Sequence, residues 1–292
     1  GTMTKTAFIG LGVMGYPMAG HLAKNGHDVT VYNRTSAKAE AWVKEHGGAS
    51  ADTPAKAADG CDVVFSCVGN DNDLRSVVYG DDGILAGMKK GAVYCDHTTA
   101  SAIAAREIDN TARDLGIGFL DGPVSGGQAG AENGALTIMV GGEKKDFDVA
   151  EPVAQAYGKA VTLMGPAGSG QLTKAVNQIC IAGLVQGLSE GLAFADKAGL
   201  DAGKVVDVIS KGAAQSWQMD NRAESMIDDK FDFGFAVEWM RKDMGIALAE
   251  ARDNGALLPA TALIDQFYAE ITAAGGSRWD TSSLIRLLTR KE

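Results

Sequence analysis

The sequence predicts two domains: an N-terminal α/β domain built on a parallel sheet and a C-terminal domain made only of helices. From residue 6 to about 161, short β-branched apolar runs alternate with Ala-rich amphipathic stretches, a pattern typical of βαβ units. After residue 165 helical periodicity continues without a candidate strand. The helix breakers Gly165-Pro166-Ala167-Gly168 separate the two patterns, so we expect domains at 3–164 and 165–292.

Seven apolar runs of the first domain are candidate strands. They are TAFIG (6–10), DVTVYN (28–33), DVVFSCV (62–68), AVYCDHT (92–98), GIGFLDGPV (116–124), LTIMVGG (136–142) and AVTLMG (160–165). The second domain is expected to open with one long helix over 168–198, rich in Ala, Gly and Leu, that links the two domains. Further helices are expected over 202–213, 216–227, 235–254, 259–274 and 280–290.

Composition excludes several classes of partner and location. The formal net charge is −10, and an acidic surface repels nucleic-acid backbones and anionic lipid, so neither nucleic acid nor a membrane is expected as a partner. No apolar run reaches the roughly 18 residues of a membrane span, and no charged-then-apolar leader opens the chain. The four cysteines form no CxxC pair and are widely spaced, which favours reduced thiols in the cytoplasm.

No metal site is expected. The histidines lack metal-ligand spacing, and surface or capping roles are expected for them. They are His21, His27, His46 and His97. The GxSxG match at 187–191 lies inside the expected long helix and not at the strand-to-helix turn of a nucleophile elbow, and the sequence contains no Walker A loop, so hydrolase and kinase functions lose their main support.

A glycine-rich loop joins the first apolar run to a helix-like stretch that ends near Lys24. The loop consists of Gly10, Leu11, Gly12, Val13, Met14 and Gly15. In a dinucleotide-binding loop the first glycine turns the chain, the second lets the backbone approach the pyrophosphate, and the third packs helix on strand. The helix N-terminus then offers N–H groups to the phosphates. The surrounding strand and helix favour this interpretation over an ordinary turn.

The second run ends in Asn33-Arg34-Thr35, about twenty residues past the glycines, where NAD-binding proteins usually place an acidic residue on the ribose. Arg34 can instead pair with a 2′-phosphate, so the sequence favours NADP over NAD. The alternative is an exposed arginine at a strand end. Ligands of open α/β sheets bind at the carboxyl ends of strands, so Val68-Gly69 and Thr98-Thr99 are expected to line the same cofactor.

Two further segments carry chemistry. In Ser125-Gly126-Gly127, backbone N–H groups and the serine hydroxyl can hold a carboxylate, although a tight structural turn has the same sequence. On the long helix, Lys174, Asn177 and Gln178 stand at i, i+3 and i+4 and share one face. A buried lysine can donate the proton that hydride transfer to a carbonyl requires, whereas a solvated lysine on an amphipathic helix is the commoner case.

These segments together resemble the β-hydroxyacid dehydrogenase family, which includes 3-hydroxyisobutyrate dehydrogenase, tartronate semialdehyde reductase and glyoxylate/succinic semialdehyde reductases. The resemblance covers nearly the whole chain. It rests on FIGLGVMGYPMAGHL, DHTTAS, FLDGPVSGGQAGAENGALTIMVGG, GSGQLTKAVNQ and the later Lys242-Asp243. It implies a Rossmann-type N-terminal domain joined by a long helix to an all-α domain that mediates homodimer or homotetramer formation.

The resemblance also implies residue roles. Gly10 to Gly15 would hold the pyrophosphate, Asn33, Arg34 and Thr35 would face the adenosine ribose, Val68 and Thr98 would lie along the cofactor, and Lys242 would approach the nicotinamide. Ser125, Gly126 and Gly127 would hold the substrate carboxylate, and Lys174 would be the general acid/base. The family commonly places Asn four residues after this lysine, so here the orienting amide is either Asn177 or Gln178. Gly69 replaces the usual proline, and Trp239 is bulkier than usual and is expected in the core.

The expected activity is reversible hydride transfer between NADP, or NAD, and a short 3-hydroxy acid or its semialdehyde. An oxidative decarboxylase resembling 6-phosphogluconate dehydrogenase is the alternative enzyme, but that family is much longer and carries His before Asn after its lysine. A dinucleotide-binding module without catalysis is a further alternative, against which the retained Lys174 argues. The sequence does not choose among methylmalonate, tartronate and succinic semialdehydes and glyoxylate.

Overall fold

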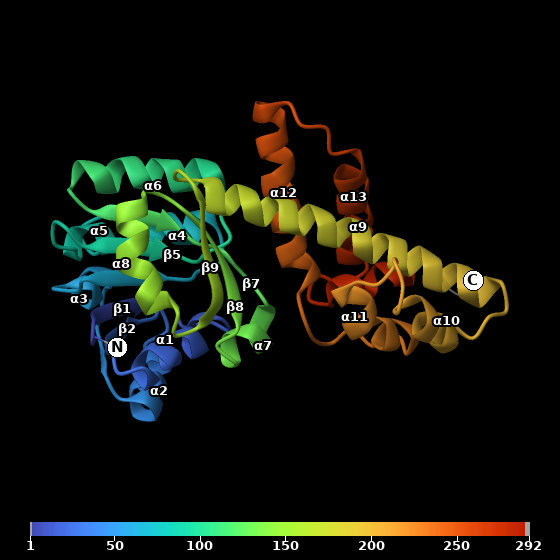
Figure 1. The fold of residues 1–292 in the computed structure, drawn as a ribbon, viewed down its shortest axis with the longest axis horizontal. Coiled ribbons are helices and arrows are strands. Elements are labelled where there is room, and N and C mark those ends of the chain that lie inside the picture. The colour runs from blue at the N-terminus through green and yellow to red at the C-terminus, as the bar shows by residue number, and fades with distance from the viewer. Residues whose placement is uncertain (1, 290–292) are drawn as a thin grey trace. The chain divides into compact units, whose positions relative to one another are not determined.

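The computed structural model in Figure 1 describes residues 2–289 of the 292-residue chain. It divides into two compact units, one ending at Lys174 and the other beginning at Ala175. The final residues of the expected second domain and of its expected last helix, 290–292, lie outside the described residues.

The first unit contains a nine-stranded sheet in the order β3-β2-β1-β4-β5-β6-β8-β7, with β9 also paired to β8. The strands are β1 (Lys5–Ile9), β2 (Asp28–Tyr32), β3 (Ala49–Ser50), β4 (Val63–Ser66), β5 (Val93–Asp96), β6 (Gly118–Asp121), β7 (Val124–Ser125), β8 (Leu136–Gly141) and β9 (Gly158–Gly165). The predicted α/β class is confirmed. Strands β3 and β7 were not predicted, because runs this short carry no periodicity.

The sheet is not parallel throughout, which corrects the sequence-based expectation. The six neighbouring strands β3, β2, β1, β4, β5 and β6 run parallel. Strand β8 is antiparallel to β6 and β7, and β9 runs parallel to β8. Residues 126–135, which join β7 to β8, are too few for the dozen or more residues of a parallel crossover. The chain therefore turns back on itself at this edge.

Helices cover both faces of the sheet (Figure 1). They are α1 (Gly15–Lys24), α2 (Ser36–His46), α3 (Pro54–Ala58), α4 (Asp71–Val78), α5 (Ile84–Gly87), α6 (Ala102–Asp114), α7 (Gly127–Glu132) and α8 (Lys144–Ala154). Because successive strand side chains point to opposite faces, Phe8 packs in one apolar cluster with α1, α2 and α8, while Ala7 and Ile9 pack in another with α3 to α6. Both faces of the sheet are therefore buried under helices, and this packing holds the central strands in place.

The second unit is helical. Its elements are α9 (Ser169–Lys197, which begins in the first unit), α10 (Ala202–Ile209), α11 (Trp217–Ile227), α12 (Val237–Asn254), α13 (Pro259–Ala273) and the 3-10 helix η1 (Thr281–Leu287). Two apolar clusters form its core, one around Met240, Met244 and Tyr268 and the other around Leu188 and Phe231. The all-helical prediction for this part is confirmed.

The segment 280–290 was expected to form an α-helix, but its described part is the 3-10 helix η1. The Asp280 side chain accepts hydrogen bonds from the backbone and the hydroxyl of Ser282, so polar side chains compete with α-helical bonding here.

Helix α9 is long and apolar. Among the described residues it is the one helix that reaches the length and composition of a membrane span, with a window of mean hydropathy 1.3. Core helices of soluble proteins pass the same test. The helix is therefore weak evidence for a membrane, and its sequence contains the polar residues Lys174, Asn177 and Gln178 near one end.

Candidate active site

The glycine-rich loop follows β1 and is shaped by close backbone packing. A Cβ atom on Gly10 would lie 2.2 Å from the carbonyl oxygen of Cys67, and one on Gly15 would lie 1.9 Å from the carbonyl oxygen of Gly10. Only glycine fits at either position. A Cβ on Gly12 would meet nothing within 4 Å, so packing does not demand this glycine, and its open space suits the approach of a ligand to the backbone.

Helix α1 starts at this loop without a side-chain cap. Its N-cap residue, Met14, makes no capping hydrogen bond, and no acidic residue lies in the first turn. The Tyr16 N–H bonds the Gly12 carbonyl oxygen and Pro17 has no N–H, but no side chain caps the positive end of the helix dipole, which therefore favours an anion here. Together with the open Gly12, this arrangement fits the pyrophosphate of a dinucleotide.

The turn after β2 is tied to the glycine loop. Asn33 accepts a hydrogen bond from the Leu11 backbone N–H at 2.9 Å through Oδ1, and its Nδ2 donates to the Thr35 carbonyl at 3.1 Å. Asn33 is predicted to face the ribose, and its amide also holds two backbone segments together. The Arg34 side chain is exposed, and Thr35 precedes α2 without capping it. Arg34 is thus the accessible basic group of this turn.

A buried polar network joins the ends of β4 and β5. One carboxylate oxygen of Asp96 accepts bonds from the Ser66 hydroxyl (2.7 Å) and the Thr98 hydroxyl (2.8 Å). The Thr98 hydroxyl in turn accepts a bond from the Val68 N–H at 3.0 Å. Burial raises the pKa of Asp96 to about 7. Asp96 and Ser66 were not among the predicted site residues, although each is a polar residue inside an otherwise apolar run.

His97 is buried, which contradicts the expected surface or capping role. Its Nδ1 lies 2.6 Å from the Gly122 carbonyl oxygen and its Nε2 lies 2.6 Å from the Tyr157 hydroxyl. Burial lowers the pKa of His97 to about 4, so the ring is neutral at pH 7. Because a carbonyl only accepts, Nδ1 carries the proton and Nε2 accepts from Tyr157. A capping role does hold for His21, whose Nε2 bonds the carbonyl oxygens of Ala131 and Glu132 at the end of α7.

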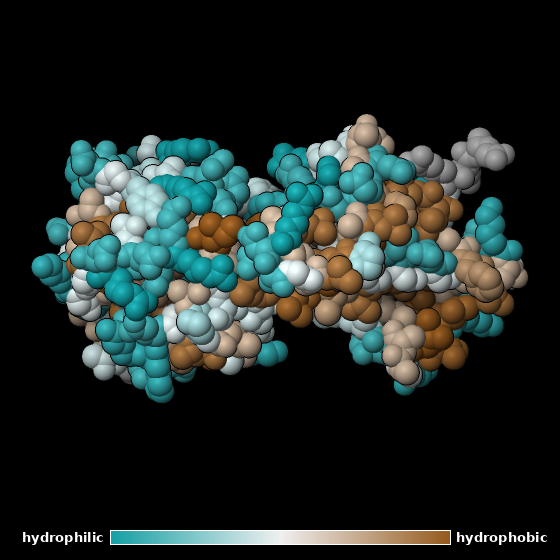
Figure 2. All heavy atoms as spheres, turned by 90° about the horizontal axis from the view of Figure 1, so that it is seen from above, coloured by the Kyte–Doolittle hydropathy of each residue, from teal (hydrophilic) through white to brown (hydrophobic). Residues whose placement is uncertain are grey.

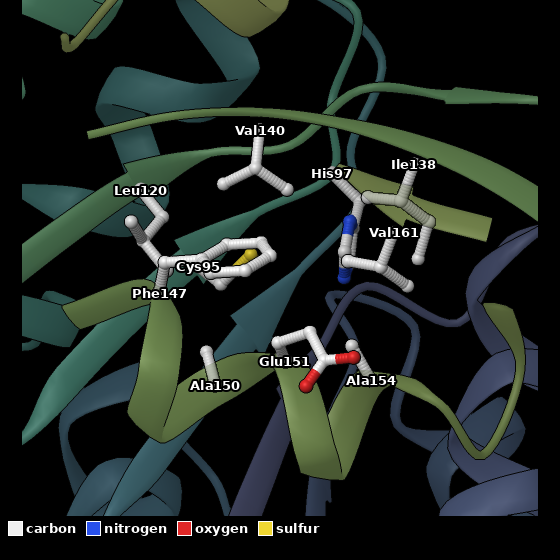
Figure 3. Close-up of a pocket in the computed structure, with 10 residues that line it drawn as sticks. All are labelled: Cys95, His97, Leu120, Ile138, Val140, Phe147, Ala150, Glu151, Ala154 and Val161. Atoms are coloured by element: carbon white, nitrogen blue, oxygen red, sulfur yellow. The ribbon is translucent and has the colours of Figure 1, made fainter. Parts of the chain in front are cut away.

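Figure 3 shows the small cavity beside His97, lined by Cys95, Phe147 and Glu151 among others. Its volume is about 10 Å³, close to the space of one water molecule, so it cannot hold a nicotinamide. A larger pocket of about 420 Å³ lies in the second unit between α10 and α11. It is lined by the four carboxylates Asp207, Asp220, Glu224 and Asp228 and by no basic residue. Such a lining repels an anionic substrate.

The turn after β7 contains the expected carboxylate-binding residues. Ser125 is half-buried, and Gly126 and Gly127 are exposed with φ of +132° and +62°. A Cβ on Gly127 would meet nothing within 4 Å. The N–H groups of this turn are therefore reachable from solvent at the start of α7.

Lys174 is buried, with 8% of its surface exposed. Lysine is almost never fully buried unless it is paired, so the alternative of a solvated lysine does not describe this residue. It is the last residue of the first unit, which also holds the glycine loop and the Ser125 turn.

The two amides that follow Lys174 are linked to each other. The Asn177 side chain donates to the Gln178 side-chain oxygen at 2.8 Å, and the buried Gln178 donates to Asp243 on α12 at 2.8 Å. Lys242, also on α12, lies 3.5 Å from the carboxylate of Asp243 and 5.3 Å from the ring centre of Trp239. Trp239 is 40% exposed, so it is not part of the core as expected.

The predicted site residues are divided between the two units, and Lys174 and the turn from Ser125 to Gly127 belong to the first. The carboxyl ends of the adjacent strands β1, β2, β4 and β5 bring together the glycine loop, Asn33 to Thr35, Val68, Gly69 and Thr98 in the first unit. Asn177, Gln178 and Lys242 belong to the second unit. In residues 2–289 no group of three or more His, Cys, Asp or Glu side chains is arranged to hold a metal ion.

Comparison with known families covers both units. Residues 5–165 match the NAD binding domain of 6-phosphogluconate dehydrogenase, and residues 168–288 match the NAD-binding family model of NADP-dependent 3-hydroxyisobutyrate dehydrogenase. These matches, with the relatives below, decide the family. The chain belongs to the β-hydroxyacid dehydrogenase family. Like other β-hydroxyacid dehydrogenases it is an oxidoreductase, and its cofactor is NAD(P).

Three relatives illustrate the range of this family. An uncharacterized oxidoreductase of Shewanella frigidimarina is 65% identical over 288 residues and 99% of both chains. The 2-hydroxy-3-oxopropionate reductase of Escherichia coli is 35% identical over 97% of both chains. The structure of Mycobacterium tuberculosis 3-hydroxyisobutyrate dehydrogenase with L-serine has a TM-score of 0.90 and 30% identity, covering 99% of this chain and 100% of that chain.

Proposed function

We propose that this β-hydroxyacid dehydrogenase interconverts a short 3-hydroxy acid and its semialdehyde, with NADPH as the reductant and Lys174 as general acid/base. The burial of Lys174 is the observation that carries the proposal, because this side chain is shielded from solvent, unlike an ordinary lysine on an amphipathic helix. The match of 168–288 to the NADP-dependent 3-hydroxyisobutyrate dehydrogenase model favours this reaction over the decarboxylase alternative.

Binding of the cofactor would use the first unit. The pyrophosphate would lie at the N-terminus of α1 over Gly10 to Gly15, and Val68, Gly69 and Thr98 would line the ring side. Arg34 is exposed where an NAD-binding protein places an acid, so its guanidinium can pair with a 2′-phosphate. Lys242 remains a predicted contact of the nicotinamide half. Bound NADPH supplies the hydride.

The substrate would be held at its carboxylate. The Ser125 hydroxyl and the N–H groups of Gly126 and Gly127 would donate to it and fix the carbonyl for attack. During reduction Lys174 would donate a proton to the carbonyl oxygen as the hydride arrives, and in oxidation it would take the proton back. Gln178 is the better candidate for the orienting amide, since Asp243 and Asn177 both hold it in place. L-serine, bound by the M. tuberculosis relative, is itself a 3-hydroxy acid.

The proposal includes self-association and a cytoplasmic location. Most large hydrophobic side chains that are exposed in the described chain lie in the helical unit, and Figure 2 shows brown, hydrophobic surface over that unit on one face. Phe194 is 73% exposed and Leu257 90%, which supports burial against a second copy in a homodimer or homotetramer. None of the four cysteines is in a disulfide, which suits a reducing compartment. Light scattering after size-exclusion chromatography gives the oligomeric mass.

Lys174→Ala tests the acid/base role. Turnover of a panel of short semialdehydes with NADPH should fall by a factor of about 10² or more, while NADPH affinity stays near that of the wild type. Lys197→Ala, at the exposed end of the same helix, is the matched control and should keep normal turnover. Turnover of Lys174→Ala within a few-fold of the control would reject the role.

A further inference from the structure

Two buried side chains join the first turn of α9 to the sheet. The Gln171 side chain, 3% exposed, donates to the Thr98 carbonyl at 2.7 Å and accepts from the Ala100 N–H at 3.0 Å. Asp121, fully buried at the end of β6, accepts from the Gly168 N–H at 2.8 Å through one oxygen and from the Gln171 N–H at 3.0 Å through the other. Each side chain makes two hydrogen bonds to the backbone, and two bonds fix the orientation of the helix turn relative to the sheet as well as its distance.

The bonds to Asp121 satisfy the N-terminus of α9. Helices begin with N–H groups that lack partners, and a carboxylate at that end also meets the positive end of the helix dipole. Burial raises the pKa of Asp121, and the N–H bonds from Gly168 and Gln171 oppose that rise. A buried carboxylate that accepts the N–H bonds of Gly168 and Gln171 holds the start of the helix in place.

Close backbone packing places this turn directly against the sheet. A Cβ on Gly170 would lie 2.4 Å from the Met139 carbonyl oxygen on β8 and 2.6 Å from the Asp121 carbonyl oxygen on β6. A Cβ on Gly141 would lie 2.8 Å from the Ser169 backbone nitrogen. The helix start therefore touches the sheet directly, with no intervening side chain.

The same contacts connect the three groups of the proposed reaction. Thr98, whose carbonyl binds Gln171, is the expected cofactor contact at the end of β5. Asp121 precedes the substrate turn at Ser125 by four residues, and Lys174 follows Gln171 by three on a continuous helix, hence on the same side. An α-helix rises 1.5 Å per residue, so a slip of even one residue would move the ammonium by more than the roughly 1 Å that can cost about 10²-fold in rate.

We propose that Gln171 and Asp121 are positioning residues that set the place of Lys174 relative to the nicotinamide and the substrate carboxylate by clamping the first turn of α9 to the ends of β5 and β6. The inference rests on the proposed function, because it assigns these residues a role through Lys174. They need not touch substrate or cofactor themselves.

Gln171→Met tests the clamp, because methionine keeps the length of the side chain and removes both amide bonds. Gln186→Met is the matched control, since Gln186 lies on the same helix and its amide nitrogen donates to the exposed Glu190 on that helix. Turnover at saturating NADPH is measured per NADPH-binding protomer, obtained from the stoichiometry of a fluorescence titration, so that unfolded protein does not count. NADPH affinity should stay within about three-fold, since Asp96 holds the Thr98 hydroxyl independently of Gln171.

Turnover of Gln171→Met should fall about ten-fold or more, and that of Gln186→Met should stay within two-fold of the wild type. In a Lys174→Ala background, measured in single turnovers, Gln171→Met should cause no further loss, because it acts through the absent lysine. Asp121→Asn, which keeps the shape but puts an amide NH₂ toward one of the helix N–H groups, should lower turnover in the same direction.

A turnover of Gln171→Met within two-fold of Gln186→Met, or a full additional loss in the Lys174→Ala background, would overturn the clamp. If Gln171→Met binds no NADPH, Gln171→Asn takes its place, since its shorter amide cannot bridge Thr98 and Ala100. The two proposals fail separately. Normal turnover of Lys174→Ala rejects the acid/base role, whereas a defective Lys174→Ala beside a normal Gln171→Met rejects the clamp alone.

Discussion

The nucleotide end and the chemical end of the first unit are built in different ways. The loop after β1 is shaped by backbone: Gly10 and Gly15 allow contacts that no side chain permits, and the space beside Gly12 is left open. The chemical end is shaped by buried side chains, with Asp121 and Gln171 bonded to the start of α9 and Lys174 one turn further on. Backbone shape can be recognised from a short motif, whereas a clamp of distant side chains cannot.

The largest effects on NADPH affinity are expected from two glycine substitutions in the loop. Gly15→Ala should raise the NADPH dissociation constant about 10²-fold and lower the melting temperature, because the new methyl group would overlap the Gly10 carbonyl. Gly12→Ala should leave the melting temperature unchanged, since no protein atom lies within 4 Å, yet weaken NADPH about ten-fold by filling the space of the pyrophosphate. Fluorescence titration and thermal melts measure both. Wild-type NADPH affinity in Gly12→Ala would show that the cofactor does not cross this glycine.

The neighbours Asp96 and His97 should make the stability of the protein depend on pH in opposite directions. Burial lowers the pKa of His97 from 6.5 to about 4, so its contribution to stability is full above pH 6.5 and is lost as the pH falls toward 4. Burial raises the pKa of Asp96 from 3.8 to about 7, so its contribution is full below about pH 4 and is lost as the pH rises toward 7. The two effects oppose each other between pH 4 and 6.5.

Single variants should separate these effects. Relative to the wild type, the unfolding free energy of His97→Gln should fall by about 3 kcal/mol as the pH rises from 4 to 6.5, and that of Asp96→Asn should rise by a similar amount. Urea melts at several pH values measure both slopes. Parallel pH profiles of all three proteins would contradict the opposing shifts.

Arg34→Asp is expected to have the smallest effect and probes the solvent-exposed rim of the nucleotide end. The ratio of kcat/KM with NADPH to that with NADH should fall about ten-fold, since the variant loses the partner of the 2′-phosphate and gains an acid that repels it. Arg106→Asp, on α6, is a charge-matched control and should keep the ratio. An unchanged ratio in Arg34→Asp would mean that the phosphate is bound elsewhere.

Much of the architecture could be predicted, and the misses have physical causes. The order of strands and helices follows from apolar periodicity, which is local. The antiparallel return of β8 does not, because it depends on the short connection 126–135 rather than on any feature of the strand itself. Likewise Asn33 lies at the expected strand end, but only the folded loop shows that its amide bonds Leu11 and Thr35.

By itself the sequence determined the α/β and all-helical parts, the glycine loop, and the residue types that suit a dinucleotide, a carboxylate and a proton donor. Only the tertiary structure decided that Lys174 is buried, that His97 is a neutral core residue, and that Asp121 and Gln171 fasten α9 to the sheet. The physical reason is range. Helix and strand patterns repeat within a few residues, whereas burial and hydrogen bonds between residues 98 and 171 exist only after the chain between them has folded.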